Sequence, residues 1–564
     1  MRARPHARTL TLIAVAVFAA SIFAAAHAQQ QPPPQPVQLY AGMGNLHHAI
    51  HTSNPEAQKF FDQGLTLVYA FNHEQAIRSF ERASELDPAA AMPYWGKALA
   101  LGPNYNVDID LEHEKSPYAT IQKAKELAAA GPENERDYVN ALAVRYSDDP
   151  KADLKKIALD YANAMRELAH KYPNDPDAQV IFAESLMDLH PWQLWTVDGK
   201  PNENTPEIIS TLEAVLKRWP NHPGANHYYI HALEASPNPE LAQMSADRLG
   251  NMVPSAGHLV HMPAHIYLRT GNYSAAVKAN QDAIASDLAF LKTTGTSNSM
   301  YGIMYLTHNI DFLYYAAGMN GQFKVSLDAA NMVADTARPA LDEIPMAEIT
   351  IPEPMMPLLR FGRWDDVLKL PIPNPKFLGA TMYSHFGRGV AFAEKGQLAD
   401  AEAERKAFAE SVAKLPAGLA FGMLYNDWSV ITGIASHVLN ARIAWAEMKS
   451  ASPANTKDVD IGIAIDNLRQ AVAIQDKMNY DEPPEWYYPV RESLGAALLR
   501  SGKASDAEAV FREDLKFHPN NPRALFGLWK SLEAQNKTAE AGRVRSVFVA
   551  AWKDADTQLR IEDF

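Results

Sequence analysis

The chain contains no cysteine. This absence excludes disulfide bonds, thiolate metal sites and cysteine nucleophiles. A metal site in this chain must therefore use histidine, aspartate, glutamate and backbone oxygens. With 564 residues and 47% hydrophobic side chains, the chain can bury a large core, and its length exceeds that of one ordinary domain.

Several well-known catalytic motifs are also missing. Gly42-Met43-Gly44 lacks the flanking strand and helix of a phosphate-binding loop, and no Gly-x-Ser-x-Gly nucleophile motif occurs. Tyr228 stands where the glutamate of a His-Glu-x-x-His zinc peptidase would follow the first histidine. These absences argue against a zinc peptidase of that type, but they leave other metal-dependent chemistry open.

Basic side chains are outnumbered by acidic ones, 52 to 66, which gives a formal net charge of −14. Cleavage after Ala28 would remove three arginines and no acidic residue, so the net charge would fall to −17. Such a surface repels phosphate backbones, which makes nucleic acid an unfavourable partner but leaves cations acceptable.

The N-terminus has the pattern of a secretory signal peptide, predicted for residues 1–28. An apolar run from Leu10 to about Ala26 is short for a membrane span, and Ala26-His27-Ala28 fits a cleavage site. The basic residues that precede the run are Arg2, Arg4 and Arg8. We expect a periplasmic or secreted protein, cleaved after Ala28 and without a membrane span thereafter. The alternative is an uncleaved N-terminal anchor.

Alternating apolar and polar residues, the signal of a β-strand, are almost absent, and helical repeats take their place. Near the N-terminus, Phe60-x-x-x-Gly64-x-x-Leu67 precedes Ala76-x-x-x-Phe80-x-x-Ala83, with Pro88 after it. Near the C-terminus, Leu494-Gly495-x-x-Leu498 precedes Ala507-x-x-x-Phe511 and Pro519. Small residues allow two helices to approach closely, and proline ends the second helix.

These motifs resemble those of tetratricopeptide repeat (TPR) proteins, in which about 34 residues form two antiparallel helices. The resemblance is strong at both ends and looser between, and it extends to exported bacterial TPR proteins. It implies an all-α, TPR-like α-solenoid, a right-handed superhelix of helix pairs with irregular insertions. Proteins of this class are usually described as protein–protein interaction scaffolds, but a fold alone does not determine function.

The predicted domain organisation has five parts. Residues 29–54 form a Pro/Gln-rich linker and N-terminal arm after the signal peptide. A first TPR-like array covers residues 55–335, a Pro-rich connection covers 336–376, and a second TPR-like array covers 377–564. Further irregular insertions are expected at 102–117, 190–206 and 476–487. Insertions of this kind often gather on the binding face of a solenoid.

Two stretches place histidines at matching helical positions. The first is Asn226-His227-Tyr228-Tyr229-Ile230-His231, and the second is Gly257-His258-Leu259-Val260-His261-Met262-Pro263-Ala264-His265. Residues three or four apart share a helix face, so each stretch presents a stripe of imidazoles.

The repeat register predicts where these stripes point. With Gly271 as the turn glycine and Pro220 as a helix-ending proline, both stretches carry histidine at the fifth and ninth repeat positions. The TPR resemblance implies that the second, fifth, ninth and twelfth positions of the first helix line a concave groove. The predicted groove stripe is Glu184, His227, His231, Glu234, His258, His261, His265, His308 and Asp311.

Six imidazoles on neighbouring helices predict a metal site. Imidazole with carboxylate suits divalent transition metals such as Zn and Cu, and thiolate-dependent sites are excluded. The predicted ligands are His227, His231, His258, His261, His265 and His308. Six histidines exceed the four ligands of one ion, so two metals, an uncoordinated acid or base, or a pair of three-histidine copper sites remain open. Glu184 and Glu234 are candidate catalytic bases.

Other residues could line the same groove. Arg269 could present a guanidinium to a ligand carboxylate or form a surface ion pair. Glu485 and Trp486 could cover a ligand, although a packed connecting loop is favoured there and around Trp192. His47, His48 and His51 belong to an arm expected to be solvated.

Two functional hypotheses follow. The first is an exported solenoid whose His-lined groove binds a transition metal and which could act as a metal-dependent enzyme on a peptide or small molecule held there. The second is a metal-free scaffold that binds peptides or periplasmic protein partners, with the histidines as hydrogen-bonding groove residues.

Overall fold

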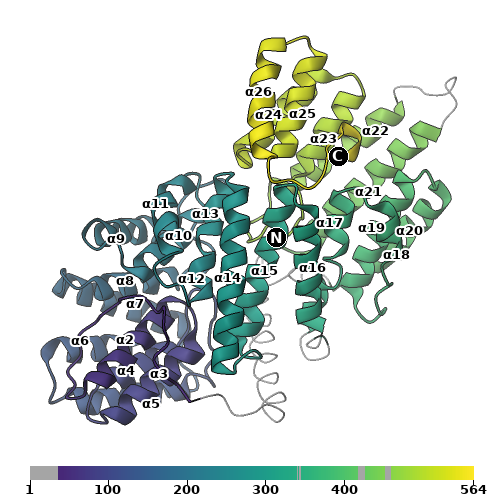
Figure 1. The fold of residues 1–564 in the computed structure, drawn as a ribbon. Helices are drawn as coiled ribbons and strands as arrows, with labels where there is room; N and C mark the ends of the chain where they lie inside the picture. Colours follow the sequence, from purple (N-terminus) through teal and green to yellow (C-terminus); the bar gives the residue numbers. More distant parts are fainter. Residues whose placement is uncertain (1–35, 339–340, 342–344, 417–425, 451–458) are drawn as a thin grey trace, which may run out of the picture. The chain divides into compact units, whose positions relative to one another are not determined.

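The computed structural model describes residues 36–338, 341, 345–416, 426–450 and 459–564 (Figure 1). The predicted signal peptide lies outside the described residues. Helices make up the regular structure, and the described residues contain no β-strand. Two isolated bridges, Asn104–Val107 and Trp195–Pro201, occur in irregular segments. The all-α prediction is therefore confirmed.

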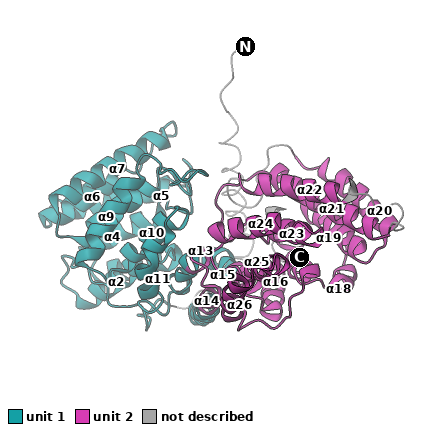
Figure 2. Ribbon diagram, turned by 90° about the horizontal axis from the view of Figure 1, so that it is seen from above, with its two compact units in different colours: residues 1–266, 279–309 teal, residues 267–278, 310–564 magenta. Residues whose placement is uncertain are grey.

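The chain divides into two compact units (Figure 2). Unit 1 comprises residues 36–266 and 279–309 of the described chain, and unit 2 comprises 267–278 and the described residues from 310 onward. The division falls within three helices, Pro263–Arg269 (α13), Tyr273–Thr294 (α14) and Met300–Met319 (α15), which contribute residues to both units.

The helices that belong wholly to unit 1 are α2 Pro55–Tyr69, α3 His73–Leu86, α4 Met92–Leu101, α5 Lys115–Ala128, α6 Glu133–Ala143, α7 Leu154–Lys171, α8 Pro176–Met187, α9 Thr205–Arg218, α10 Pro223–Glu234, η1 Pro239–Ala242, α11 Gln243–Leu249 and α12 Gly257–His261. Proline in the first turn is typical of their starts, as in α8 and α10, because a helix leaves its first N–H groups without internal partners.

The helices that belong wholly to unit 2 are α16 Phe323–Ala337, η3 Pro345–Thr350, α17 Met355–Arg360, α18 Trp364–Lys369, α19 Leu378–Glu394, α20 Leu398–Val412, α21 Trp428–Ser450, α22 Val459–Gln475, α23 Val490–Arg500, α24 Ala504–Phe517, α25 Pro522–Ala534, α26 Thr538–Ala551 and η4 Ile561–Asp563. The predicted Pro-rich connection, residues 336–376, thus includes η3, α17 and α18.

Glycines allow consecutive helices to pack closely against one phenylalanine. A Cβ atom at Gly64 or Gly96 would lie 2.6 or 2.5 Å from the Phe80 ring, which is fully buried between α2 and α4. Unit 2 repeats the arrangement, because a Cβ atom at Gly495 or Gly527 would lie 2.5 or 2.1 Å from the Phe511 ring. These contacts explain the spacing of small and aromatic residues in the repeat motifs.

The turns between paired helices share one backbone geometry. In several of them a glycine has a positive φ, for example 76° at Gly271, 77° at Gly321 and 79° at Gly502. The next residue donates its N–H to a carbonyl five residues earlier, which closes the preceding helix, as in the 2.7 Å bond from Asn272 N to Tyr267 O.

The N-terminal arm packs against unit 1. Ser255 N donates to Gly42 O at 3.1 Å, and the His48 imidazole lies 2.8 Å from the Asp177 carboxylate. His48 and Met43 are buried. The expected solvated arm is therefore corrected here: buried ion pairing and apolar contact hold this segment on the helices. His47, by contrast, is largely exposed.

Among the described residues, no helix combines the length and the apolar character that a membrane span needs. The irregular insertions expected at 102–117, 190–206 and 476–487 largely coincide with irregular segments in the structure.

Candidate metal centre

Six histidines of unit 1 form two adjacent groups of three. Triad one consists of His227 and His231 on α10 and His258 on α12, and triad two consists of His261, His265 and His308. Within each triad, one ligand nitrogen of each residue lies within 4.8 Å of the others. The structure thus brings together all six histidines that the sequence marked as ligands.

The triads adjoin each other. The ring centroids of His258 and His261 are 5.9 Å apart, and those of His231 and His265 are 5.6 Å apart. The six rings therefore form one continuous cluster.

Local helix geometry positions these side chains. His227 and His231 lie four residues apart on α10, a helix whose residues are all buried. Pro263 separates α12 from α13, yet Met262 N still donates to His258 O at 3.1 Å across the junction. The chain therefore stays nearly helical, and the three histidines of this segment remain on one side.

Oxygen acceptors fix the tautomers of three histidines. His227 Nδ1 donates to the Tyr69 carbonyl at 2.7 Å, and His231 Nδ1 donates to Glu234 Oε1 at 2.6 Å. His265 Nδ1 donates to Glu234 Oε2 at 2.5 Å. Carbonyl and carboxylate oxygens only accept, so the proton sits on Nδ1 and the Nε2 lone pair is left to bind. Metal-bound histidines are usually held in this way.

Triad two contains a pair of nitrogens that neutral rings cannot satisfy. His261 Nδ1 lies 2.6 Å from Asn280 Oδ1 and so carries the proton of a neutral ring. His261 Nε2 faces His265 Nε2 at 2.7 Å, although both atoms then hold lone pairs. Two lone pairs that face each other repel, and a proton or a metal cation between the two nitrogens would remove this repulsion.

Triad one is less constrained. His258 Nε2 lies 3.1 Å from His227 Nε2 and can donate to it, because no acceptor among the described residues holds His258 Nδ1. His231 Nε2 is buried and has no hydrogen-bond partner among the described residues. Buried polar atoms without partners are rare in proteins, and this one is oriented as a metal ligand would be.

Burial favours the uncharged form of five of the six histidines, namely His227, His231, His258, His261 and His308. It lowers the pKa values of His227, His258 and His261 well below the ordinary value, and neighbouring imidazoles lower them further. Burial and His265 lower the pKa of His308 to about 3. Neutral imidazole is the form that binds metals.

Aromatic side chains cover triad one. The Phe71 ring centroid lies 4.6 Å from that of His227 and 5.4 Å from that of His258. Tyr105 lies 5.3 Å and Trp192 5.7 Å from His231 by the same measure. These residues come from the α2–α3 turn and from the irregular segments after α4 and α8, so separate parts of the chain enclose one group of histidines.

This cover changes the expectation of an open groove. Five of the six histidines are at most 2% exposed, and only His308 is partly accessible. The repeat register placed the histidines on the correct helix faces. It could not account for the insertions that bury those faces.

The two candidate bases have different surroundings. Both carboxylate oxygens of Glu234 hold ligand histidines, one in each triad. Glu184 lies instead near Arg145 and Asp188, which form an ion pair at 2.6 Å. Burial and Asp188 raise the pKa of Glu184 well above its ordinary value.

The remaining predicted groove residues belong to unit 2. Burial and nearby Asp481 raise the pKa of Asp311 to about 7, and the same two causes raise that of Glu485. Trp486 is buried, with its ring centroid 5.6 Å from that of Phe386. The Arg269 guanidinium lies 5.7 Å from the centre of the Tyr480 ring. Asp311 and Glu485 thus share one carboxylate-rich region.

A further group of possible ligands, His48, Asp175 and Asp177, is already hydrogen-bonded. Asp177 accepts from His48 at 2.8 Å, from Tyr69 at 2.7 Å and from His222 at 3.1 Å. Asp175 caps α8 and accepts from Tyr138. This group is a satisfied structural network that fastens the N-terminal arm.

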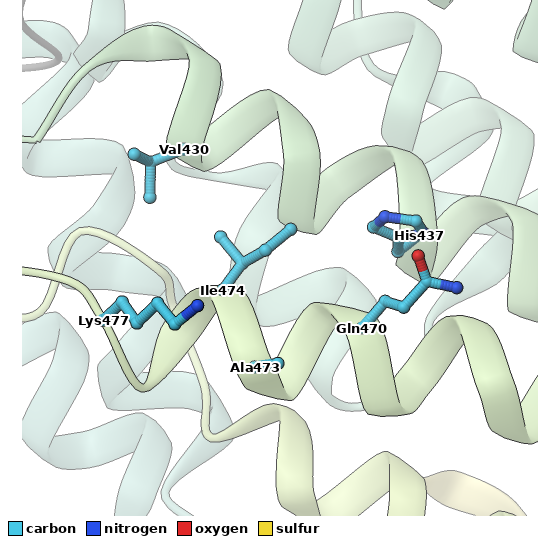
Figure 3. A pocket seen from close by; sticks show the side chains of 6 residues that line it. All are labelled: Val430, His437, Gln470, Ala473, Ile474 and Lys477. Atoms are coloured by element: carbon cyan, nitrogen blue, oxygen red, sulfur yellow. The ribbon is translucent and has the colours of Figure 1, made fainter.

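A cavity of about 380 Å³ lies between α21 and α22 of unit 2 (Figure 3). Its lining residues are Val430, His437, Gln470, Ala473, Ile474 and Lys477. No residue predicted for the site lines this cavity.

Sequence reasoning missed several residues around the histidines. Asn280 and the Tyr69 carbonyl, which orient His261 and His227, carry no local sequence signal. Phe71 did carry a local sequence signal, because it stands at a turn position where several other turns have glycine. Tyr105 lies in an insertion whose path no periodic pattern specifies.

Comparison with known proteins gives fold similarity only. No protein-family model and no curated protein sequence matches the chain. The chain is similar to the solved structure of human IFIT1 with PPP-AAAA, at 13% identity and a TM-score of 0.30, covering 88% of this chain and 90% of that one. It is also similar to the Cut9–Hcn1 assembly of the APC/C, at 10% identity and a TM-score of 0.28, covering 90% and 89%.

A third similar structure is yeast Tom70, at 12% identity and a TM-score of 0.26, covering 90% of this chain and 93% of that one. With TM-scores this low, the comparisons do not identify equivalent residues. The fold assignment therefore depends on the chain's own helix pairs, turns and glycine contacts. By those features, this protein has a tetratricopeptide-type fold.

Proposed function

We propose that this protein binds two transition-metal ions, one in each histidine triad. The observation that carries the proposal is the His261–His265 pair, whose Nε2 atoms face each other at 2.7 Å. Each ring uses its Nδ1 proton elsewhere, on Asn280 and on Glu234. Two nitrogens this close, with their rings oriented by Asn280 and Glu234, are placed as a pair of ligands to one metal ion would be.

The donor set favours copper. Each triad offers three imidazoles, whereas zinc held by three protein ligands needs a fourth one such as water. Divalent copper also generally binds nitrogen ligands more tightly than zinc does. Two monovalent copper ions would bring less charge into this buried cluster, where Glu234 is the carboxylate that bonds to both triads. A lower charge on the ions reduces the free-energy cost of burying them.

The chain's own residues supply the rest of the chemistry. Glu234 orients one histidine of each triad, the Tyr69 carbonyl orients His227, and Phe71 excludes water from triad one. A copper pair would supply one-electron chemistry and dioxygen binding when present. A metal-dependent reaction with a small molecule is therefore the enzymatic role that we propose.

Export is part of the same proposal. We infer from the signal pattern of residues 1–28 that the protein is exported to the periplasm or out of the cell. Intact-mass measurement of the protein purified from its natural host would test this. A mature chain beginning at Gln29 is expected, and an intact Met1 in the membrane fraction would contradict it.

Elemental analysis tests the metal proposal. Tag-free protein of residues 29–564 should hold about two equivalents of copper, and His231→Ala or His265→Ala should each hold about one. The His231→Ala/His265→Ala double variant should hold almost none. The matched control is His113→Ala/His170→Ala, which removes two exposed histidines and should keep both ions.

Two results would contradict the proposal. One is no metal in the wild type after incubation with Cu, Zn, Fe, Ni and Mn. The other is equal metal in the wild type and the double variant. The first result would favour a metal-free TPR-like scaffold that binds peptide or protein partners, and capture of such partners would then be the next experiment. The second result would show that the metal binds outside the two triads.

A further inference from the structure

Phe71 occupies a backbone position that other turns of the described chain give to glycine or asparagine, as at Gly502 and Asn536. Its φ is 54°, close to the 73° of Gly396 and the 79° of Gly502. Asn72 N donates to Leu67 O at 2.9 Å, and Lys503 N donates to Leu498 O at 2.9 Å in the same way. A side chain larger than glycine is strained in this region, so phenylalanine is an unfavourable choice for the turn itself.

The Phe71 side chain lies against triad one. Its ring is 3% exposed and nearly parallel to those of His231 and His258, with interplanar angles of 25° and 29°. The ring centroid lies 6.0 Å from His231 and 5.4 Å from His258. Strained residues often cluster at functional sites, and here the turn places an aromatic ring directly on three ligand histidines.

Trp192 has the same unusual backbone on another segment. Its φ is 60°, it is half-buried, and its ring centroid lies 5.7 Å from that of His231 and 5.0 Å from that of Tyr105. Tyr105 is itself buried against His231. In two segments far apart in sequence, a residue with a left-handed backbone conformation thus holds an aromatic ring over the same triad.

We propose that Phe71 and Trp192 determine which ligands reach the metal of triad one. This inference rests on the proposed metal binding. The two rings exclude bulk water and larger molecules, because apolar aromatic walls leave no hydrogen-bonding path to the metal. A ligand of two or three atoms, such as dioxygen or azide, is the class that could pass these rings and reach a metal held by triad one.

The test uses copper-loaded protein of residues 29–564 and azide as the probe. Phe71→Gly and Trp192→Gly suit their positive φ values and remove the covering rings. Azide affinity, measured by absorption titration of the Cu(II)-loaded protein, should rise at least tenfold in both variants. Copper content should stay at two equivalents.

Two controls separate cover from backbone relief. Asn536→Gly changes a residue with φ 59° in a turn of unit 2 and should leave azide affinity unchanged. Phe71→Leu keeps apolar bulk over the histidines and should also bind azide as the wild type does. Because Trp192 is only half-buried, its variant remains informative if Phe71→Gly does not fold.

The outcomes separate the role of the two aromatic rings from the metal binding on which that role depends. Wild-type azide affinity in copper-loaded Phe71→Gly or Trp192→Gly protein would overturn the role of these rings. A wild type without metal would overturn the metal centre itself. Equal gains in azide affinity for Asn536→Gly would show that turn relaxation, rather than cover, controls access.

Discussion

The Glu234 carboxylate hydrogen-bonds to one histidine of each triad. It accepts from His231 Nδ1 at 2.6 Å and from His265 Nδ1 at 2.5 Å, so it sets the tautomer of one ligand in each. With both oxygens engaged in this way, Glu234 is better described as a positioning residue than as a free catalytic base.

We predict that Glu234→Gln weakens copper binding by about 10–100-fold in one triad, the usual cost of losing such a partner. A glutamine amide accepts from only one imidazole, and its NH₂ group donates toward the other. That second histidine must then move its proton to Nε2, which blocks the ligand atom. Competition with a chelator, followed by elemental analysis, measures the effect.

The control for this change is Glu240→Gln, an exposed carboxylate on η1. It should bind copper as the wild type does. Unchanged affinity and two equivalents of copper in Glu234→Gln would rule out the positioning role.

Asp287 predicts a pH dependence of stability that does not come from titration of the histidines themselves. It is fully buried, accepts from Tyr301 and Asn309 at 2.8 Å, and burial raises its pKa from 3.8 to about 7. Between these two values the folded state binds more protons than the unfolded state. The stabilising contribution of the protonated group is therefore lost as pH rises from about 4 to about 7.

Metal-free wild type should consequently lose stability relative to Asp287→Asn over that pH range, by up to about 4 kcal/mol. The relative stability should be constant above about pH 8. Thermal unfolding of both proteins at matched pH values measures this difference. A difference that does not change between pH 4 and pH 7 would show that Asp287 is ionised throughout.

At the scale of elements, helix pairing depends on glycines that face a neighbouring phenylalanine. Gly527 on α25 lies so close to Phe511 that an added Cβ would meet the ring at 2.1 Å, whereas a Cβ at Gly542 on α26 would meet no atom within 4 Å. The two helices are consecutive, which makes these glycines a matched pair.

We predict opposite effects of alanine at these two positions. Gly527→Ala should destabilise unit 2 by roughly 1–3 kcal/mol, because the ring must move out of a packed core. Gly542→Ala should stabilise it by about 0.5–1 kcal/mol, because alanine restricts the unfolded chain and favours helix. Urea denaturation of both variants checks the signs. Equal effects would show that α25 does not pack closely on Phe511.

At the scale of the whole molecule, the six histidines proposed as metal ligands all belong to unit 1. A ligand that binds only the folded state stabilises it by about 2.7 kcal/mol at a concentration one hundred times its dissociation constant. Binding should therefore protect unit 1 most strongly.

We predict that copper slows hydrogen exchange in α10 and α12, which carry the ligands of triad one. Exchange in α24 to α26 of unit 2 should be unchanged, since none of the six histidines lies there. Mass spectrometry of copper-loaded and chelated protein gives this comparison. Equal protection of both regions would indicate that metal acts on the molecule as a whole.

Local patterns were sufficient to predict the repeats. The spacing of glycines and phenylalanines around Phe80 and Phe511 follows from direct contacts between consecutive helices. Residues close together in the sequence therefore determine it. The His-x-x-x-His spacings likewise put imidazoles on one helix face, whatever else the chain does. Whether the histidines hold metal stays a prediction.

The sequence by itself determined the helix pairs, the absence of thiolate chemistry and the six histidines that come together. Each of these depends on residue identity or on spacing within a few turns of helix. Only the tertiary structure decided that two triads share Glu234, that Asn280 and the Tyr69 carbonyl orient rings, and that Phe71 and Trp192 cover them. These contacts join residues up to 158 positions apart, and their geometry depends on how separate helices and insertions pack.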